Sequence, residues 1–275
     1  MRLVLGVRTY DLTTRALVMG VLDAAGRGLA SDSGAAPVDA YLARAERLVD
    51  DGADLLEVGT VTVTPVAPQL SEPEELDVVV PLVDALAAAV GVPVACATTR
   101  ASVARAAYAA GAVVGDDPSG FSDPGYLPAA VVAGASVVAR HPAAARGAPS
   151  PPCGTDDVVS QVRAFLGEQG GRAEKAGLPR ERIVLDAGVD GLAATEQSLE
   201  LLRASPLLAE LGYPLASALG SGSAGPADER SDDARATTAA AAALAVVGGC
   251  RVLRTSDVRT ARRVADVLAA ILAGG

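Results

Sequence analysis

The sequence predicts an α/β fold, namely a (β/α)8 TIM barrel with a short N-terminal strand extension. Three observations predict it: short runs rich in Val, Ile and Leu alternate with helical stretches, eight such units can be placed, and 275 residues suit one barrel of this kind. We therefore expect residues 1–275 to form a single domain. Apolar residues make up 50% of the chain but aromatic residues only 3%, so Ala, Val and Leu must fill the core.

Each unit ends its helix at a glycine and continues into the next strand. Residues 38–51 show the pattern best, because their apolar side chains share one helical face and Gly52 ends the helix before a buried run at 54–58. Residues 3–7 are expected to form a small strand outside the barrel. The barrel strands are expected near residues 16–22, 54–58, 93–97, 112–115, 136–140, 183–187, 215–218 and 251–254, with helices between them.

Two loops interrupt this rhythm after the fifth and seventh expected strands. They span Pro142–Thr155 and Gly220–Asp233 and consist mostly of small, polar, Pro and Gly residues. Both belong to the C-terminal face of the barrel, where barrel enzymes place their active sites. Their composition favours mobile surface loops over ordered lids.

Charge and cysteine content narrow the classes of partner and compartment. A formal net charge of −10 argues against nucleic acid and membrane surfaces as partners, since both are anionic. The apolar runs are too short and too Ala-rich to span a bilayer, and the N-terminus has no signal-peptide pattern. Cys96, Cys153 and Cys250 fit neither a zinc motif nor a disulfide framework, so we expect a cytoplasmic protein.

Five segments resemble motifs of the dihydropteroate synthase family, in the family's order and at expected strand ends. The match runs almost end to end and is closest to the divergent paralogue group of actinobacteria. That family condenses a pterin pyrophosphate with p-aminobenzoate, so the resemblance implies a small-molecule ligand at the C-terminal face. The segments are Met19–Leu22 (MGVL), Asp54–Gly59 (DLLEVG), Ala110–Gly120 (AGAVVGDDPSG), Ile183–Asp190 (IVLDAGVD) and Arg251–Val258 (RVLRTSDV).

The sequence departs from the family pattern at positions that the resemblance links to catalysis. Asp23 replaces a metal-linked Asn, Ala97 a pterin-reading Asp and Ser256 a His near the pyrophosphate. The pterin-contacting lysine is absent. Losing one transition-state donor or cation typically costs about 10²–10³ in rate, so we expect the parent reaction to be out of reach. The other departures are Ala24–Gly28 after the first strand, Val63 and Thr64 in the second loop, Leu192–Ala193 for Gly-Lys, and Gly220–Gly222 for the lysine-bearing run.

Three residues are the candidate catalytic groups. Asp186 matches the family and is either a ligand-facing acceptor or general base, or a cap of local N–H groups. Asp116 and Asp117 are adjacent in a strand and point to opposite sides, which favours Asp116 in the pocket and Asp117 in a structural role. His141 is a possible acid or base near neutrality, although a structural hydrogen-bonding role is more common for a lone histidine.

The candidate ligand-binding residues lie around these groups. Arg254 and Asp257 either pair with each other or leave Arg254 to hold an anionic group. Ser221 belongs to a loop that could cradle phosphate, but the flexible-loop interpretation is stronger. Carboxylates at the strand ends, which we expect to be reachable by solvent, could hold a divalent cation, but their spacing is not diagnostic, and neither a metal nor a cofactor is predicted. The ligand-binding set is Asp23, Asp117, Arg254, Ser256, Asp257 and Ser221.

Three functions remain open on the sequence. The first is a barrel repurposed for acid/base catalysis on a small non-phosphorylated molecule in an acidic pocket, with secondary metabolism as its setting. Slightly below it stands a non-catalytic paralogue that binds a ligand or partners another protein, and well below both a residual folate-pathway transferase. A homodimer is expected because the resembling family dimerises through outer helices, for which residues 236–247 and 258–272 are the candidates.

Overall fold

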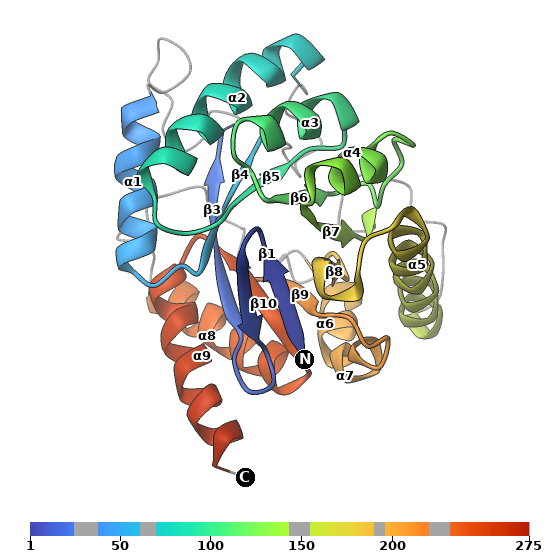
Figure 1. Ribbon diagram of the computed structural model, residues 1–275. Coiled ribbons are helices and arrows are strands. Elements are labelled where there is room, and N and C mark those ends of the chain that lie inside the picture. The colour runs from blue at the N-terminus through green and yellow to red at the C-terminus, as the bar shows by residue number, and fades with distance from the viewer. Residues whose placement is uncertain (25–37, 61–69, 143–154, 190–195, 220–231, 275) are drawn as a thin grey trace.

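Eight parallel strands close into a barrel in the computed structural model, and helices cover its outer surface (Figure 1). The structure describes residues 1–24, 38–60, 70–142, 155–189, 196–219 and 232–274. The expected (β/α)8 fold class is confirmed. The strands pair in chain order and β10 closes on β3; they are β3 (Leu17–Asp23), β4 (Leu55–Gly59), β5 (Val94–Ala97), β6 (Val114–Asp117), β7 (Ser136–Arg140), β8 (Ile183–Asp186), β9 (Leu215–Leu219) and β10 (Cys250–Thr255).

Helices follow the barrel strands, as the alternating pattern predicts. Local signals fix several helix ends: Ser71 and Glu74 form a capping box at the start of α2, and Gly134 ends α4 with φ 63°. The two loops expected after the fifth and seventh strands lie almost entirely outside the described residues. The helices are α1 (Val38–Asp50), α2 (Glu72–Ala89), α3 (Ala101–Ala109), α4 (Tyr126–Ala133), α5 (Thr155–Ala176), α6 (Glu196–Arg203), α7 (Ser205–Ala209), α8 (Asp232–Val247) and α9 (Val258–Ala273).

A β-hairpin precedes the barrel in place of the single strand expected at residues 3–7. Strands β1 (Arg2–Leu5) and β2 (Arg8–Asp11) pair antiparallel, and Gly6 turns the chain with φ 60°. The second strand was missed because its sequence, RTYD, has no apolar alternation. Buried leucines from this segment, Leu3, Leu5 and Leu12, pack with the side chains inside the barrel.

The barrel interior is filled by side chains that alternate along each strand. One face of each strand packs against the helices, while the other contributes to a separate apolar cluster inside the barrel. Side chains two positions apart along a strand point to the same face. The residue two positions after each of these interior residues therefore also faces the barrel axis. The interior cluster includes Leu17, Met19, Leu55, Ala95, Val114, Val138, Val184, Ala216 and Val252.

No helix among the residues that the structure describes is long and apolar enough to cross a membrane.

Candidate functional site

A charged layer lies inside the barrel, next to the apolar cluster. Its residues follow the apolar interior residues by two positions along each strand, toward the C-terminal ends. Alternation places one residue from each strand in this layer, and charged residues occupy five of the eight positions. Ala97 and Ala218 are small, so they leave room beside the long charged side chains. The layer consists of Val21, Glu57, Ala97, Asp116, Arg140, Asp186, Ala218 and Arg254.

Glu57 and Arg254 form the most tightly bonded pair of the layer. Nε of Arg254 donates to Oε1 and Oε2 of Glu57, both at 2.9 Å, and Nη2 donates to Oε1 at 2.6 Å. Burial alone would raise the pKa of Glu57, but the charge and hydrogen bonds of Arg254 outweigh it and lower that pKa to about 2. Glu57 is therefore ionised, although it is fully buried.

Arg140 lies among three carboxyl groups that come from three different strands. Its Nη2 donates a short hydrogen bond to Oδ2 of Asp116 and lies 3.7 Å from Oε2 of Glu57. Its Nε lies 3.6 Å from Oδ2 of Asp186. Burial and the nearby Arg254 lower the pKa of Arg140, but the surrounding carboxyl groups outweigh them and raise it. Arg140 is thus a permanently charged group with only 5% of its surface exposed.

Asp116 is the member of the layer whose environment favours the neutral form. Burial is the largest cause that raises its pKa well above the ordinary value, and the adjacent Glu57 raises it further against the attraction of Arg140. Three carboxyl groups, those of Glu57, Asp116 and Asp186, face two guanidinium groups, those of Arg140 and Arg254. The layer is balanced in charge if one carboxyl group keeps its proton, and the raised pKa of Asp116 favours that residue over Glu57.

Asp186 ends β8 and is held by groups on its own loop and on β7. Its Oδ1 accepts a hydrogen bond from the backbone N–H of Gly188 at 2.8 Å, and its backbone carbonyl accepts one from the N–H of His141 at 2.9 Å. Only 1% of Asp186 and none of Asp116 is exposed. The expectation that these two side chains are reachable by solvent is therefore wrong, because both are buried.

Two of the expected ligand-binding aspartates bind backbone groups of the protein. Asp117 accepts hydrogen bonds from the N–H of Ser119 at 2.7 Å and of Phe121 at 2.9 Å, which holds Phe121 at φ 63°. This is the structural role favoured for the outward-facing member of the Asp116–Asp117 pair. Asp257 caps α9 by accepting from the N–H of Thr260 at 3.3 Å. Arg254 binds Glu57, so the Arg254–Asp257 pairing left open on the sequence is not the one adopted.

His141 follows Arg140 and lies on the outer side of the barrel wall. Its ring packs edge-on against Phe165 of α5, with ring centroids 4.8 Å apart. Burial lowers its pKa, which favours the neutral ring at physiological pH. Its proposed catalytic role stays a prediction, since the ring faces a helix while Arg140 takes the inward position.

The remaining expected residues lie near the C-terminal ends of their strands. Asp23, partly buried, ends β3 beside Gly59 of β4. Ser256, also partly buried, directly follows β10. Ser221 lies outside the described residues. Within the described part of the chain, no three His, Cys, Asp or Glu side chains form a group that could hold a metal ion.

The sequence interpretation missed Glu57 and Arg140, two of the five charges in the layer. Each carried a signal, because each stands in an otherwise apolar strand, LLEVG and SVVAR. A charged side chain in a buried strand almost always has a partner. Searching for opposite charges on other inward-facing strand positions would have predicted the pairing with Arg254 and Asp116.

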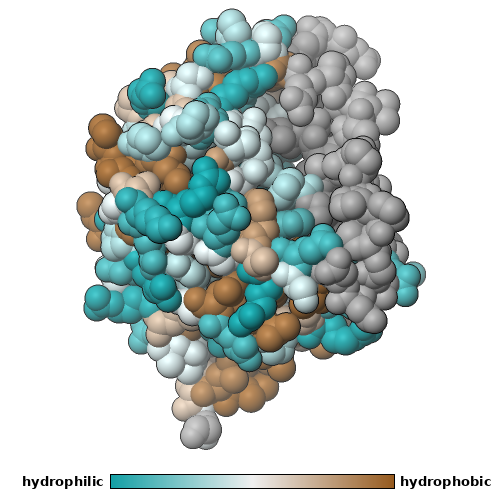
Figure 2. All heavy atoms as spheres, turned by 90° about the vertical axis from the view of Figure 1, so that its right-hand side faces the viewer, coloured by the Kyte–Doolittle hydropathy of each residue, from teal (hydrophilic) through white to brown (hydrophobic). Residues whose placement is uncertain are grey.

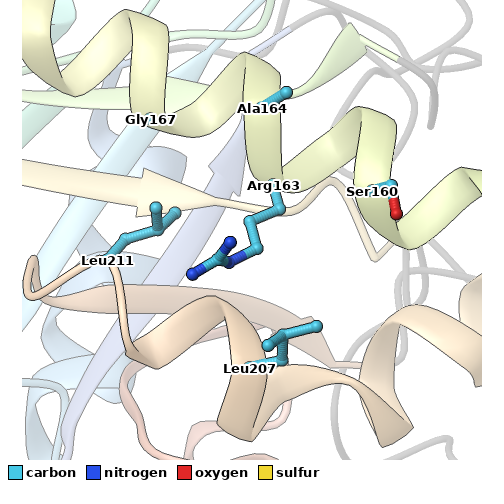
Figure 3. Close-up of a pocket in the computed structure, with 6 residues that line it drawn as sticks. All are labelled: Ser160, Arg163, Ala164, Gly167, Leu207 and Leu211. Atoms are coloured by element: carbon cyan, nitrogen blue, oxygen red, sulfur yellow. The ribbon is translucent and has the colours of Figure 1, made fainter.

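A surface groove lies away from this layer, between α5 and α7 (Figure 3). Its volume is about 410 Å³, and Arg163 extends into it near Leu207 and Leu211. Nη2 of Arg163 lies 3.6 Å from Oε2 of Glu210, and both side chains are exposed. The groove is therefore separate from the candidate site inside the barrel.

Known proteins match this chain over nearly its full length. The family described as pterin binding enzyme matches residues 19–256. Dihydropteroate synthase of Synechocystis sp. is 30% identical over 97% of this chain and 93% of its own. The dihydropteroate synthase structure of Xanthomonas albilineans with 4-aminobenzoic acid is 32% identical, covers 99% of this chain and 98% of its own, and has a TM-score of 0.84. That of Yersinia pestis with a sulfonamide drug is 26% identical, covers both chains fully and has a TM-score of 0.83.

These comparisons correct the function expected from the sequence. A repurposed barrel without dihydropteroate synthase activity is wrong, because the full-length relatives and structural neighbours at 26–32% identity are dihydropteroate synthases. The expected loss of cations from the site did not take account of Arg140, which is a buried cation in the site itself. Several positions on which that expectation rested, namely Val63, Thr64, Leu192–Ala193 and Gly220–Gly222, lie outside the described residues. With the family matching residues 19–256, this chain belongs to the pterin-binding enzymes.

Proposed function

We propose that this protein is a dihydropteroate synthase that binds a pterin inside the C-terminal mouth of its barrel. The observation that carries the proposal is that one buried guanidinium group, that of Arg140, contacts both Asp116, whose pKa is raised well above its ordinary value, and Asp186. A pterin's amino-pyrimidinone edge presents N–H donors beside ring acceptors. An ionised carboxylate accepts from such donors, and a neutral carboxyl group both donates and accepts.

Asp116 stands where the resembling family has an Asn, and this division of roles accommodates the replacement. An Asn side chain offers N–H donors and a carbonyl acceptor, and a protonated Asp offers an O–H donor and an acceptor. Burial and Glu57 raise the pKa of Asp116 well above its ordinary value, so the fold favours the protonated carboxyl group. Asp116 can therefore supply the type of hydrogen bonds that an amide would supply, without adding a net charge to the core.

The reaction joins the pterin to p-aminobenzoate. The amine nitrogen forms a bond to the pterin's exocyclic carbon, the bond from that carbon to the pyrophosphate oxygen breaks, and the amine loses one proton. Asp186 would hold and orient the pterin ring for this attack, because it is fixed by Gly188 and Arg140.

Magnesium ion is implied by the family, and Asp23 fits it. Asp23 ends β3 and is only partly buried, and its carboxylate is a hard oxygen ligand of the kind that Mg²⁺ binds alongside water. When bound, the ion would neutralise charge on the departing pyrophosphate. The residues that follow Asp23 from position 25 lie outside the described part of the chain.

An assay of dihydropteroate formation tests the proposal. The purified protein, with Mg²⁺, the pterin pyrophosphate and p-aminobenzoate, should form product, and Asp186→Asn should abolish it. The matched control is Asp117→Asn, which alters a carboxylate that binds only loop groups among its described contacts. An active relative assayed alongside serves as the positive control. If it forms product and the wild-type protein does not, the proposal is wrong.

We also propose that two copies associate through α8 and α9 and that the compartment is the cytoplasm. Large apolar side chains are exposed on both helices, including Leu244 and Val247 on α8 and Val267 and Ile271 on α9. Figure 2 shows hydrophobic atoms gathered at the lower end of the molecule, beside the C-terminus. Cys96 and Cys250 are free cysteines, and the three cysteines of the chain give no disulfide framework, which suits a reducing environment.

A further inference from the structure

We infer that Arg140 is a positioning residue of the proposed pterin site, fixing the Asp186 carboxylate and the Asp116 carboxyl group for the uncharged pterin ring of the ligand. The inference rests on the proposed function. Arg140 is 5% exposed and ends β7, between the strands that carry the two aspartates. No ligand-binding role was expected for it from the sequence.

The guanidinium geometry links the acidic groups through separate nitrogen atoms. Nη2 binds Asp116 and lies near Glu57, while Nε is directed toward Asp186. A guanidinium group is planar and rigid, so fixing one nitrogen determines where the others lie. Arg140 therefore sets the relative positions of side chains that come from β4, β6 and β8.

The Nε contact with Asp186 is suited to a carboxylate that must still bind a ligand. At 3.6 Å it is close enough for charge compensation but too long for a hydrogen bond, and Nε donates to none of the described residues. Arg140 therefore stabilises the negative charge of Asp186 without occupying one of its acceptor positions by a direct hydrogen bond.

Arg254 is already bound to another carboxylate. Its Nε and Nη2 make three hydrogen-bond contacts with Glu57, which commits them to that carboxylate. Without Arg140, the Asp186 carboxylate would lose its cation on β7, and Asp116 would face Glu57 without the attraction of Arg140. The two ligand-binding side chains would then lose the group that fixes their relative positions and would shift, even in a barrel that remains folded.

Isothermal titration calorimetry with 6-hydroxymethylpterin tests the inference on the full chain. Arg140→Met should weaken binding about ten-fold or more, since hydrogen bonds to charged groups are stronger than those between neutral groups. Arg140→Lys should restore part of the lost affinity, because lysine keeps the charge but not the planar guanidinium group. The matched control is Arg251→Met, at the opposite end of the barrel, where Arg251 donates to backbone carbonyls of Leu12 and Val246. It should leave the affinity unchanged.

A double variant separates positioning from simple stabilisation. Arg140→Met combined with Asp116→Asn removes the carboxyl group left without its cation, so its melting temperature should recover relative to Arg140→Met while its affinity stays low. Recovery of affinity together with melting temperature would overturn the positioning role, as would an Arg140→Met protein that binds like the wild type. If the wild type itself does not bind the pterin, the proposed function is wrong. If the wild type binds and Arg140→Met binds equally well, only the positioning role is wrong.

Discussion

Arg254 donates to both carboxylate oxygens of Glu57, with Nε 2.9 Å from each oxygen and Nη2 2.6 Å from Oε1. The two residues belong to β10 and β4, which are not neighbours because β3 lies between them. The pair therefore joins strands across the barrel interior rather than along a hydrogen-bonded ladder. Glu57 is buried and only 13% of the Arg254 side chain is exposed, so water offers little substitute for this pairing.

Removing one partner of this pair should be costly. Glu57→Gln leaves the Arg254 charge, on a side chain only 13% exposed, without its carboxylate, which should lower the free energy of unfolding by about 3–5 kcal/mol. Urea denaturation measures it. The matched control is Asp51→Asn, which breaks the ion pair of Asp51 with the exposed Arg259, 2.7 Å apart, and should cost less than about 1 kcal/mol. Equal losses of unfolding free energy in the two variants would show that burial does not strengthen the Glu57–Arg254 pair.

The sequence predicted the barrel because strand and helix signals are local, but it predicted only part of the site. Asp116, Asp186 and Arg254 were anticipated at strand ends. Glu57 and Arg140 were not, because a buried charge finds its partner only when the barrel closes and brings distant strands together. Residue type and spacing give each charge a position along its strand, whereas barrel closure decides which other charge it meets.

Stability should fall as the pH rises, because Asp116 holds its proton more tightly in the folded chain. Its pKa is raised above the ordinary 3.8 by burial and by Glu57, while Arg140 and Arg254 act against this. The folded state then binds more protons than the unfolded state, so this contribution is complete below about pH 4 and is lost as the pH rises through the folded pKa, by at most about 1.4 kcal/mol per pH unit.

Urea unfolding of the wild type and Asp116→Asn between about pH 4 and 9 measures this effect. The variant should show a weaker decline with pH, because Asn does not titrate. Glu57 acts in the opposite sense, since its pKa is lowered to about 2 and its contribution is lost as the pH falls below the ordinary 4.5. Identical pH profiles for the two proteins would show that Asp116 is ionised in the fold.

Two adjacent glycines in α5 should respond oppositely to alanine. A Cβ on Gly170 would lie 2.7 Å from Cζ of Tyr213, whereas a Cβ on Gly171 would meet nothing within 4 Å. Gly170→Ala should therefore destabilise the fold by about 1–3 kcal/mol through overpacking. Gly171→Ala should stabilise it by about 0.5–1 kcal/mol, since glycine is unfavourable inside a helix. Thermal unfolding of both variants checks the packing of α5, and similar shifts would contradict it.

Asp186 and Asp117 should separate ligand binding from stability. Asp186→Asn is preferable to alanine because Asp186 is buried, and it should remove most pterin affinity while the fold is kept. Asp117→Asn should weaken the contacts to Ser119 and Phe121, costing about 1–3 kcal/mol, without loss of affinity. Calorimetric binding and urea unfolding of both proteins give the comparison. Normal pterin binding by Asp186→Asn would refute its ligand-binding role.

Association of two copies should depend on the apolar surface of α8 and α9. Leu244 and Val247 are 60% and 70% exposed, and Val267 and Ile271 are 60% and 63% exposed. The two helices pack side by side, so these residues can contribute to one surface whose burial would favour a dimer. Light scattering at micromolar concentration should give twice the mass of 27.3 kDa for the wild type.

A charge placed on this surface should separate the copies. Ile271→Glu, combined with Leu244→Glu, should give the monomer mass because each dimer would then bury carboxylates against apolar side chains. The matched control is Val132→Glu on α4, where Val132 is also exposed, at 89%, but lies on another side of the barrel (Figure 1). It should keep the dimer mass. A wild type that scatters as a monomer at these concentrations would rule out the proposed association, and a dimer that survives the double substitution would place its interface elsewhere.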